Sequence, residues 1–371
     1  MGFSLLLCCL WRTYLTLPVR LAFFRGWKVI CPVKRSSLAL LMFFFFGLPA
    51  WALEPSADMA ADAGIFSLQI ENDGVTENVD NYYTQGARFS YLSGKEAPLW
   101  SRKAAGYLPF FCQQGKVRIN YTLGQSIFTP NDISTKTLIE DDRPYAGWLY
   151  VGLGLISDSR SGSRNFKRWR DSLELNIGVV GPASLAEELQ VFGHKVRGAN
   201  EPKGWDNQLK DEPGIMLIYD RQWQGRYDIK LDSLGLDLTP HISGALGNIM
   251  TYAATGFTLR FGRHLDNDYG VPLIRPSLPG SVYFARNSGF GWYLFTGFEG
   301  RAVLQNIFLD GNTFKDSHSV DKEPLVGDFQ AGLVLTWKDY RFSFTSVHRT
   351  REFEGQESST RYGAFNLSVR L

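Results

Sequence analysis

Two groups of polar residues have the types and spacing that hydrolytic chemistry requires. Gln190 and His194 are four residues apart on a predicted helix, so their side chains share one helix face. Asn72 and Asp73 occur in IENDG, and Thr84 occurs in the nearby YYTQG. A neutral imidazole can activate water as a general base, and carboxylate, amide and hydroxyl oxygens suit a hard cation. These residue types could therefore support a hydrolysis in which a histidine activates water and a cation acts as the electrophile.

Each group also has a simpler interpretation. A single histidine is more often structural than catalytic, and the chain contains five histidines. Asn-Asp-Gly is by composition a turn sequence. The chain contains no Gly-x-Ser-x-Gly, His-Glu-x-x-His, Walker or Cys-x-x-Cys motif, so a serine nucleophile and a zinc site have no support.

The helix that would carry Gln190 and His194 lies in the long connection 181–214. Pro182 suits its first turn and Gly198 suits its end. Its apolar face would consist of Leu185, Leu189, Phe192 and Val196.

Strand-length segments with alternating apolar and polar residues recur as far as the last residue. About twelve such segments occur, which is an even number, and aromatic residues lie at their ends. These features favour an all-β fold, a transmembrane antiparallel β-barrel of about 12 strands with a short helix in an extracellular loop. A soluble exported sandwich or lipocalin-like barrel is the alternative, and connections 94–116 and 264–289 are long for periplasmic turns. The strands are expected near 65–73, 84–93, 117–127, 147–157, 171–181, 213–223, 234–244, 250–263, 290–302, 326–337, 340–352 and 360–371.

Strand alternation also predicts where the polar residues point. With the N-terminus in the periplasm, connections after odd-numbered strands are extracellular, which places both polar groups at the outer rim. Asp73 and Thr84 share the parity of lumen-facing residues and would be cross-strand neighbours. Asn72 has the opposite parity, so a bulge or strand end is required near residues 72–74.

The first 52 residues have the features of a secretory signal. The basic pair Lys34-Arg35 precedes the apolar run 38–48 and an Ala-x-Ala sequence, so cleavage is expected after Ala52. Residues 1–33 precede this complete signal and are interpreted as sequence ahead of a true start near Lys34. The run is shorter than a membrane-spanning helix, which disfavours an uncleaved anchor. Residues 53–371 would then form the mature barrel domain.

Charge and cysteine content narrow the function classes further. The 39 Lys+Arg and 37 Asp+Glu residues give a net charge of +2, which is too small a positive charge to favour nucleic-acid binding. Removal of the signal, with its six basic and no acidic residues, changes this to −4. Cys112 would be the single remaining cysteine, so the mature chain would have no internal disulfide and Cys112 is expected to be a passive thiol.

Three motifs in order resemble one known family. IEND-x6-DNYYTQG-x4-Y, DDRPYAGWLY and Q-x3-H-x3-G-x3-P-x-GW-x2-Q-x3-EPG are similar to the LpxR family of outer-membrane lipid A 3′-O-deacylases. The resemblance covers nearly all of the mature chain. It implies a twelve-stranded barrel, a monomer in the outer membrane, and a calcium-dependent esterase whose site lies between the barrel wall and a loop helix.

The resemblance also assigns roles to individual residues. It implies that His194 is the base that activates water, that Gln190 and Thr84 belong to the site, and that Ca²⁺ lies near Asn72 and Asp73. The substrate would be lipid A in lipopolysaccharide, which would lose its 3′-linked acyloxyacyl chain. An outer-membrane phospholipase and a non-catalytic barrel with ligand-binding outer loops are the alternatives.

Two departures from the family pattern affect these expectations. Asn200 stands where some members have Glu, which puts any charge-dependent role at that position in doubt. Leu371 replaces the terminal Phe that is common in outer-membrane proteins, so the assembly signal departs from its usual form.

Overall fold

The computed structural model describes residues 63–73, 82–94, 97–107, 111, 116–160, 168–225, 227–231, 234–268, 270 and 283–371. The expected signal over residues 1–52, its cleavage site and Cys112 lie outside the described residues. Among the residues that are described, no helix is long and apolar enough to cross a lipid bilayer.

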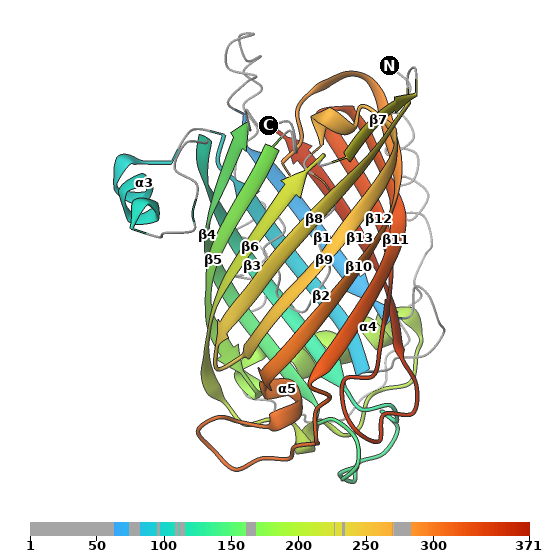
Figure 1. The fold of residues 1–371 in the computed structure, drawn as a ribbon. Coiled ribbons are helices and arrows are strands. Elements are labelled where there is room, and N and C mark those ends of the chain that lie inside the picture. The colour runs from blue at the N-terminus through green and yellow to red at the C-terminus, as the bar shows by residue number, and fades with distance from the viewer. Residues whose placement is uncertain are drawn as a thin grey trace, which may run out of the picture. The chain divides into compact units, whose positions relative to one another are not determined.

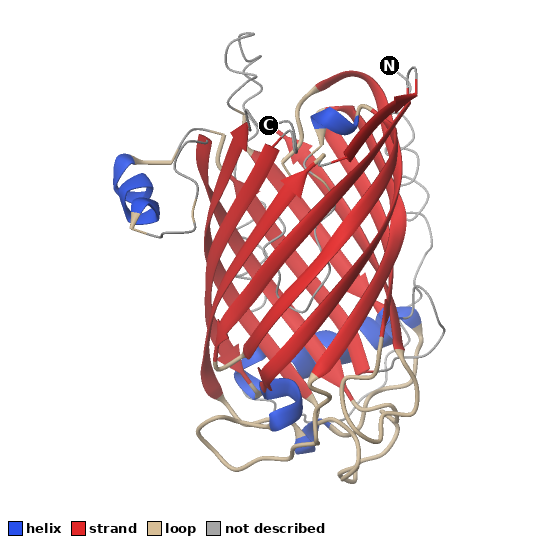
Figure 2. Ribbon diagram, viewed as in Figure 1, coloured by secondary structure: helices blue, strands red, loops and turns tan. Residues whose placement is uncertain are grey.

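Strands account for most of the described chain, and the helices lie near the strand ends (Figures 1 and 2). The α-helices within the described ranges are α3 (Leu99–Gly106), α4 (Ala186–Arg197) and α5 (Ile307–Asp310). The strands are β1 (Ile65–Asn72), β2 (Tyr82–Leu92), β3 (Lys116–Thr129), β4 (Ala146–Arg160), β5 (Arg168–Val180), β6 (Glu212–Gln224), β7 (Tyr227–Leu231), β8 (Leu234–Gly247), β9 (Met250–Arg263), β10 (Asn287–Asn306), β11 (Leu325–Lys338), β12 (Tyr340–Arg349) and β13 (Thr360–Arg370).

The strands form one closed antiparallel barrel. Strand β1 pairs with β2 on one side and with β13 on the other, and β6 pairs with both β5 and β8. The short strand β7 pairs with β8 and continues the line of β6 beyond Gly225, whose φ is +63°. The ring therefore contains twelve strands, which confirms the predicted fold class and each of the twelve predicted strand positions.

The alternation along each strand separates an apolar outer face from a polar inner face. In β13, Phe365 and Leu367 are exposed on the outside, whereas Asn366 and Ser368 are buried inside. The same alternation places Phe66 and Ile70 outside in β1, with Gln69 between them and buried. This is the pattern of a barrel that spans a bilayer.

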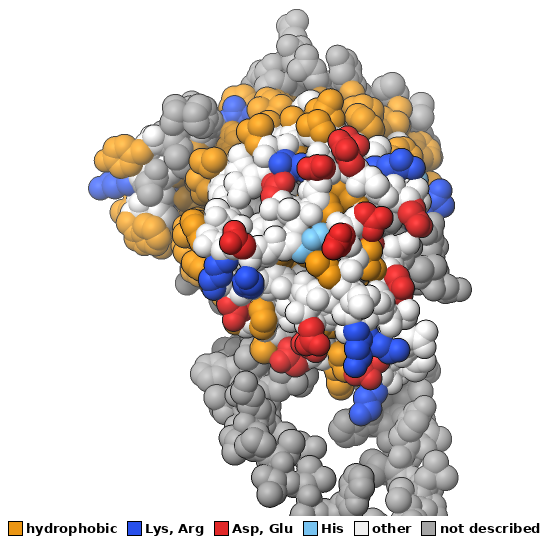
Figure 3. Space-filling model, turned by 90° about the horizontal axis from the view of Figure 1, so that it is seen from below, with side chains coloured by type: hydrophobic (Ala, Val, Ile, Leu, Met, Phe, Trp, Pro, Cys, Tyr) orange, Lys and Arg blue, Asp and Glu red, His pale blue; other side chains and the backbone are white. Residues whose placement is uncertain are grey.

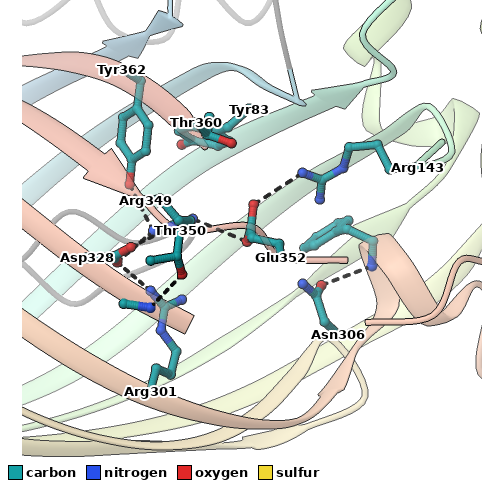
Figure 4. Close-up of polar contacts among 12 residues, drawn as sticks. Tyr83, Arg143, Arg301, Asn306, Asp328, Arg349, Thr350, Glu352, Thr360 and Tyr362 are labelled. Carbon is teal, nitrogen blue, oxygen red and sulfur yellow. Dashed lines mark hydrogen bonds and ion pairs between the residues drawn. The ribbon is translucent and has the colours of Figure 1, made fainter. Parts of the chain in front are cut away.

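Aromatic rings and ion pairs occupy parts of the lumen. Phe308 of α5 stacks on Phe128 of β3 with ring centroids 4.0 Å apart. Arg349 Nε lies 2.7 Å from Asp328 Oδ1, and the Glu352 carboxylate contacts both Arg349 and the Arg143 guanidinium, the latter at 3.4 Å (Figure 4). Each of these buried charges therefore has a partner of opposite sign, as charged groups inside a protein require.

The two long connections lie at the rim where β1 begins and β13 ends, here called the terminal rim. The opposite end, which carries α4 and α5, is called the loop rim. Asp268, near the start of the 264–289 connection, faces the lumen: its carboxylate accepts hydrogen bonds from Arg341 Nε at 2.7 Å and from the Tyr293 hydroxyl at 3.0 Å. These bonds hold the start of the connection against the lumen wall.

Asp268→Ala should destabilise the barrel, because it leaves the buried Arg341 guanidinium without its carboxylate. We expect the free energy of unfolding to fall by about 3 kcal/mol, measured by urea titration of the protein in detergent micelles. The control is Asp266→Ala, which removes an exposed carboxylate two residues earlier. Equal unfolding midpoints for the two variants would contradict this account of the connection.

Candidate active site

The first hairpin brings Asn72 and Thr84 together at the loop rim. Strand β1 ends at Asn72, and the Asn72 side-chain nitrogen donates to the backbone oxygen of Thr84 at 2.8 Å. Asp73 follows directly and is buried. The strand end that the parity of Asn72 required is present.

The prediction that Thr84 faces the lumen is wrong. The ladder between β2 and β3 shifts register between Tyr83 and Gln85, which is a β-bulge. Tyr83 therefore points inward and donates a hydrogen bond to the lumen-facing Glu71. The Thr84 hydroxyl instead lies 2.6 Å from that of Thr129, which alternation places on the outer face because its neighbour Phe128 faces the lumen.

The predicted loop helix exists but begins later than expected. Pro182 opens a short 3₁₀ turn, Leu185 adopts a left-handed conformation with φ +59°, and α4 then runs from Ala186 to Arg197. Gly198 ends it with φ +69°, as predicted from the sequence.

The buried side of α4 is the reverse of what is usual for a helix on the surface of a soluble protein, where the apolar side is buried. Its buried residues are Ala186, Gln190 and His194, which follow one another at four-residue spacing. Of the expected apolar face, Leu189 is half-buried and packs against the cluster that includes Ala186 and Trp205, whereas Phe192 and Val196 are 61% and 69% accessible. The helix thus turns Gln190 and His194 to the barrel and Phe192 and Val196 away from it.

Helix α4 packs closely on the barrel wall. A β-carbon added to Gly147 of β4 would lie 2.2 Å from both the Ala186 β-carbon and the Ser184 hydroxyl, so only glycine allows this approach. Gln125 of β3 donates to the backbone oxygen of Ser184 at 2.6 Å. These contacts fix the start of the helix on β3 and β4.

Trp205 orients Gln190 from the second half of the connection. Its indole nitrogen donates to Gln190 Oε1 at 2.9 Å, and its ring contacts Tyr145 with centroids 4.9 Å apart. Burial raises the pKa of Tyr145 to about 12, so its phenol stays protonated at neutral pH and cannot act as a base. The tyrosine therefore has a packing role.

Arg197 connects the helix to the first hairpin. Its guanidinium donates to Asn72 Oδ1 at 3.2 Å, and Arg197 is one turn after His194 on α4. The structure thus brings Asn72, Thr84 and the last turn of α4 together on the outer wall of the barrel. Among the hairpin residues that the structure describes, 65–73 and 82–92, none forms a hydrogen bond with Gln190.

The His194 ring is held in one orientation by the main chain. His194 Nδ1 lies 2.5 Å from the backbone oxygen of Asn200, and His194 is buried. A carbonyl oxygen only accepts, so Nδ1 carries the proton and Nε2 is the basic nitrogen of the neutral ring.

Sequence reasoning missed three parts of this site: Arg197, Trp205 and the main chain of Asn200. Arg197 could have been found from its helical spacing to His194, and Trp205 is part of the Gly-Trp motif. The carbonyl of Asn200 leaves no trace in the sequence, since every residue has one.

Oxygen donors at the hairpin tip fit a hard cation in chemical type. The donors are the buried Asp73 carboxylate, the Asn72 amide oxygen and the Thr84 hydroxyl. Calcium binds carboxylate and carbonyl oxygens, so the set is suitable, although Arg197 donates to the Asn72 oxygen that a cation would use. No group of three or more His, Cys, Asp or Glu side chains suited to a metal occurs among the described residues.

The wider surface adds little to this site. At the loop rim, acidic and basic side chains are scattered over a surface that is otherwise largely uncharged (Figure 3). A hollow of about 870 Å³ lies over β9, β10 and β11, lined by residues such as Ala253, Gly300 and Leu325, and includes none of the predicted site residues.

A closed twelve-stranded ring with an apolar outer face and a polar cluster under a loop helix defines a membrane-spanning β-barrel with a site on its wall. The family model described as "Outer membrane protein LpxR" matches residues 38–371, and the chain belongs to this family. It is accordingly an outer-membrane β-barrel protein.

A similar solved structure agrees with the barrel fold. The structure of LpxR from Salmonella typhimurium has a TM-score of 0.68 and 20% identity, covering 83% of this chain and 100% of that chain. At this identity the similarity shows the fold alone. The β domain of the Bordetella autotransporter BrkA has a TM-score of 0.43 and 9% identity, covering 83% of this chain and 99% of that chain. None of the curated proteins compared matches the chain.

Gly147→Ala should loosen α4 from the wall, because the added carbon collides with Ala186. Overpacking costs about 1–3 kcal/mol, so we expect roughly tenfold faster trypsin cleavage within the 181–211 connection of the folded barrel. Gly193→Ala is the matched control on α4, since its added carbon meets nothing within 4 Å. Equal cleavage rates for both variants would show that the close approach at Gly147 does not hold the helix.

Proposed function

We propose that this member of the LpxR family, an outer-membrane lipid A-modifying enzyme, hydrolyses the ester of the 3′-linked acyloxyacyl chain of lipid A. The observation that carries the proposal is the bond from His194 Nδ1 to the Asn200 carbonyl, which makes Nε2 the basic nitrogen. A buried imidazole in one fixed tautomer is the arrangement of a general base.

The surroundings of His194 favour a lipid substrate. Phe192 and Val196 are exposed on the outward face of α4, so an acyl chain beside the barrel would meet apolar side chains. The polar residues lie beneath them, between α4 and the wall. An ester group must sit at such a boundary, because its chain is apolar and its carbonyl is polar.

The reaction would use water as the nucleophile. His194 Nε2 would take a proton from a water molecule as its oxygen bonds to the ester carbonyl carbon. The bond from that carbon to the sugar oxygen then breaks, and the proton passes from the imidazolium to the leaving oxygen. The products are a free carboxylic acid and the 3′-hydroxyl of lipid A.

Gln190 and Thr84 would position the reacting groups. Trp205 holds Gln190 Oε1, which leaves the Gln190 amide nitrogen without a hydrogen-bond acceptor among the described residues. That nitrogen can donate to an ester or water oxygen. Thr84 Oγ1 shares one hydrogen with Thr129, so one of the two hydroxyls retains a proton to donate.

Ca²⁺ is the cation that the donor set suits. Asp73 and Asn72 would hold it, and Arg197 would have to release the Asn72 oxygen. When bound, the cation would polarise the ester carbonyl and stabilise negative charge on its oxygen.

His194→Ala should reduce release of the 3′ chain by about 10²- to 10⁴-fold, because a general base is lost. Asn200→Ala should leave the rate within about threefold, since the carbonyl that contacts His194 is retained. Mass spectrometry of lipid A from cells expressing each variant measures both, with heat-modifiable gel mobility as the test of barrel folding. Full activity in folded His194→Ala would exclude the proposed base.

Calcium chelation with EGTA should abolish release of the chain by the purified enzyme, and added Ca²⁺ should restore it. Asp73→Asn should raise the Ca²⁺ concentration required by at least about tenfold, because the single carboxylate of the donor set is lost. Asp206→Asn, an exposed acid in the same connection as α4, is the control. Unchanged activity in EGTA would remove the metal from the proposal and leave the histidine untouched.

A further inference from the structure

Three described residues of the long connection between β2 and β3 cover part of the outside of the barrel near the terminal rim. Val117 and Ile119 occupy outward positions of β3 yet are only 2% and 5% exposed. Tyr121, the next outward residue along β3, is 50% exposed, as a lipid-facing residue should be. The two covered residues pack with Ala97, Ala105 and Phe111 of the connection.

The cover extends over neighbouring strands. Partly buried outward residues of β4, β5 and β6 pack against the same apolar cluster, namely Leu155, Leu173 and Tyr219. Backbone bonds fix the start of the segment on β3, from Ser93 to Ile119 at 2.8 Å and from Ala97 to Val117 at 2.7 Å. Figure 1 shows α3 projecting to the side of the barrel near the terminal rim, and Ala105 of the helix belongs to the apolar cluster with Val117 and Ile119.

Helix α3 buries one narrow side and exposes large apolar residues on the others. Ser101 and Ala105, four residues apart, are buried. Leu99 and Trp100 are 74% and 63% exposed, and Tyr107 just after the helix is 87% exposed. Side chains of this size are costly to leave in water, and Trp and Tyr are the residues that concentrate at membrane interfaces.

The charge of α3 complements a phospholipid headgroup layer. Arg102 and Lys103 are exposed, and the helix sequence LWSRKAAG contains no acid. Long basic side chains can bury their stems beside apolar surface and keep their charges at the headgroups. Tryptophan, tyrosine and basic residues beside a lipid-facing wall are the composition of an interfacial segment.

We propose that α3 is an interfacial anchor that inserts Leu99, Trp100 and Tyr107 into the phospholipid leaflet at the terminal rim. Arg102 and Lys103 would contact anionic headgroups of that leaflet. The occupant is phospholipid because the segment is continuous with the lipid-facing wall: it begins where the exposed residues of β3 end. The anchor would fix the height and rotation of the barrel in the bilayer, and it does not depend on the proposed reaction.

Depth measurements on the full chain test this proposal. In a cysteine-free variant, a nitroxide is attached at Trp100→Cys or Tyr107→Cys, and the protein is reconstituted into phosphatidylethanolamine–phosphatidylglycerol vesicles. The ratio of collisions with oxygen to collisions with a water-soluble nickel chelate reports immersion. Val151→Cys on the exposed wall is the lipid control, and Lys136→Cys in a loop at the opposite rim is the water control.

Labels at positions 100 and 107 should give ratios clearly above that at Lys136 and between it and that at Val151, because an interfacial helix lies at the headgroup boundary. Values equal to that at Lys136 would overturn the proposal and show a helix that faces water. Arg102→Glu with Lys103→Glu should lower the ratio at position 100 at least about twofold in these vesicles but not in phosphatidylcholine vesicles. An equal ratio before and after this charge reversal would overturn the assigned headgroup contact.

Discussion

Closure of the sheet between β1 and β13 is the constraint on which the other features depend. It pairs the backbone of the first strand on both sides, so no edge is exposed to lipid. It also fixes which side of every strand faces outward. A polar group on the outer wall must then be covered, since lipid provides no hydrogen bonds. The candidate site satisfies this requirement because α4 lies over it.

The bulge at Thr84 has a large effect within that regular frame. One extra residue in β2 allows Tyr83 to point inward to Glu71 while Thr84 joins Thr129 outside. The polar residues of α4 face the barrel because the opposite side of the helix faces the lipid that surrounds the outer wall. Polar residues on such a helix are best satisfied against the barrel, where Trp205 and Asn200 supply partners.

The strand pattern could be predicted from the sequence because a period of two reports directly on a wall between lipid and lumen. The joint placement of Asn72, Thr84 and α4 was also within reach, by motif resemblance. Local irregularities were not, because a bulge shifts parity without changing composition. The apolar face predicted for α4 consisted of Leu185, Leu189, Phe192 and Val196, and of these Leu189 packs inward while the other three are exposed. The catalytic and metal roles of Asn72, Asp73, Thr84, Gln190 and His194 are still predictions.

The packed interior has a consequence for the organism. Over the described residues, stacked rings such as Phe128 and Phe308 and paired guanidinium groups such as Arg349 and Arg341 occupy the space that a porin keeps for water. A solute that enters the lumen from either rim therefore meets a layer of packed side chains. Extra copies of this protein are expected to add less open channel to the bacterial envelope than extra copies of a porin would.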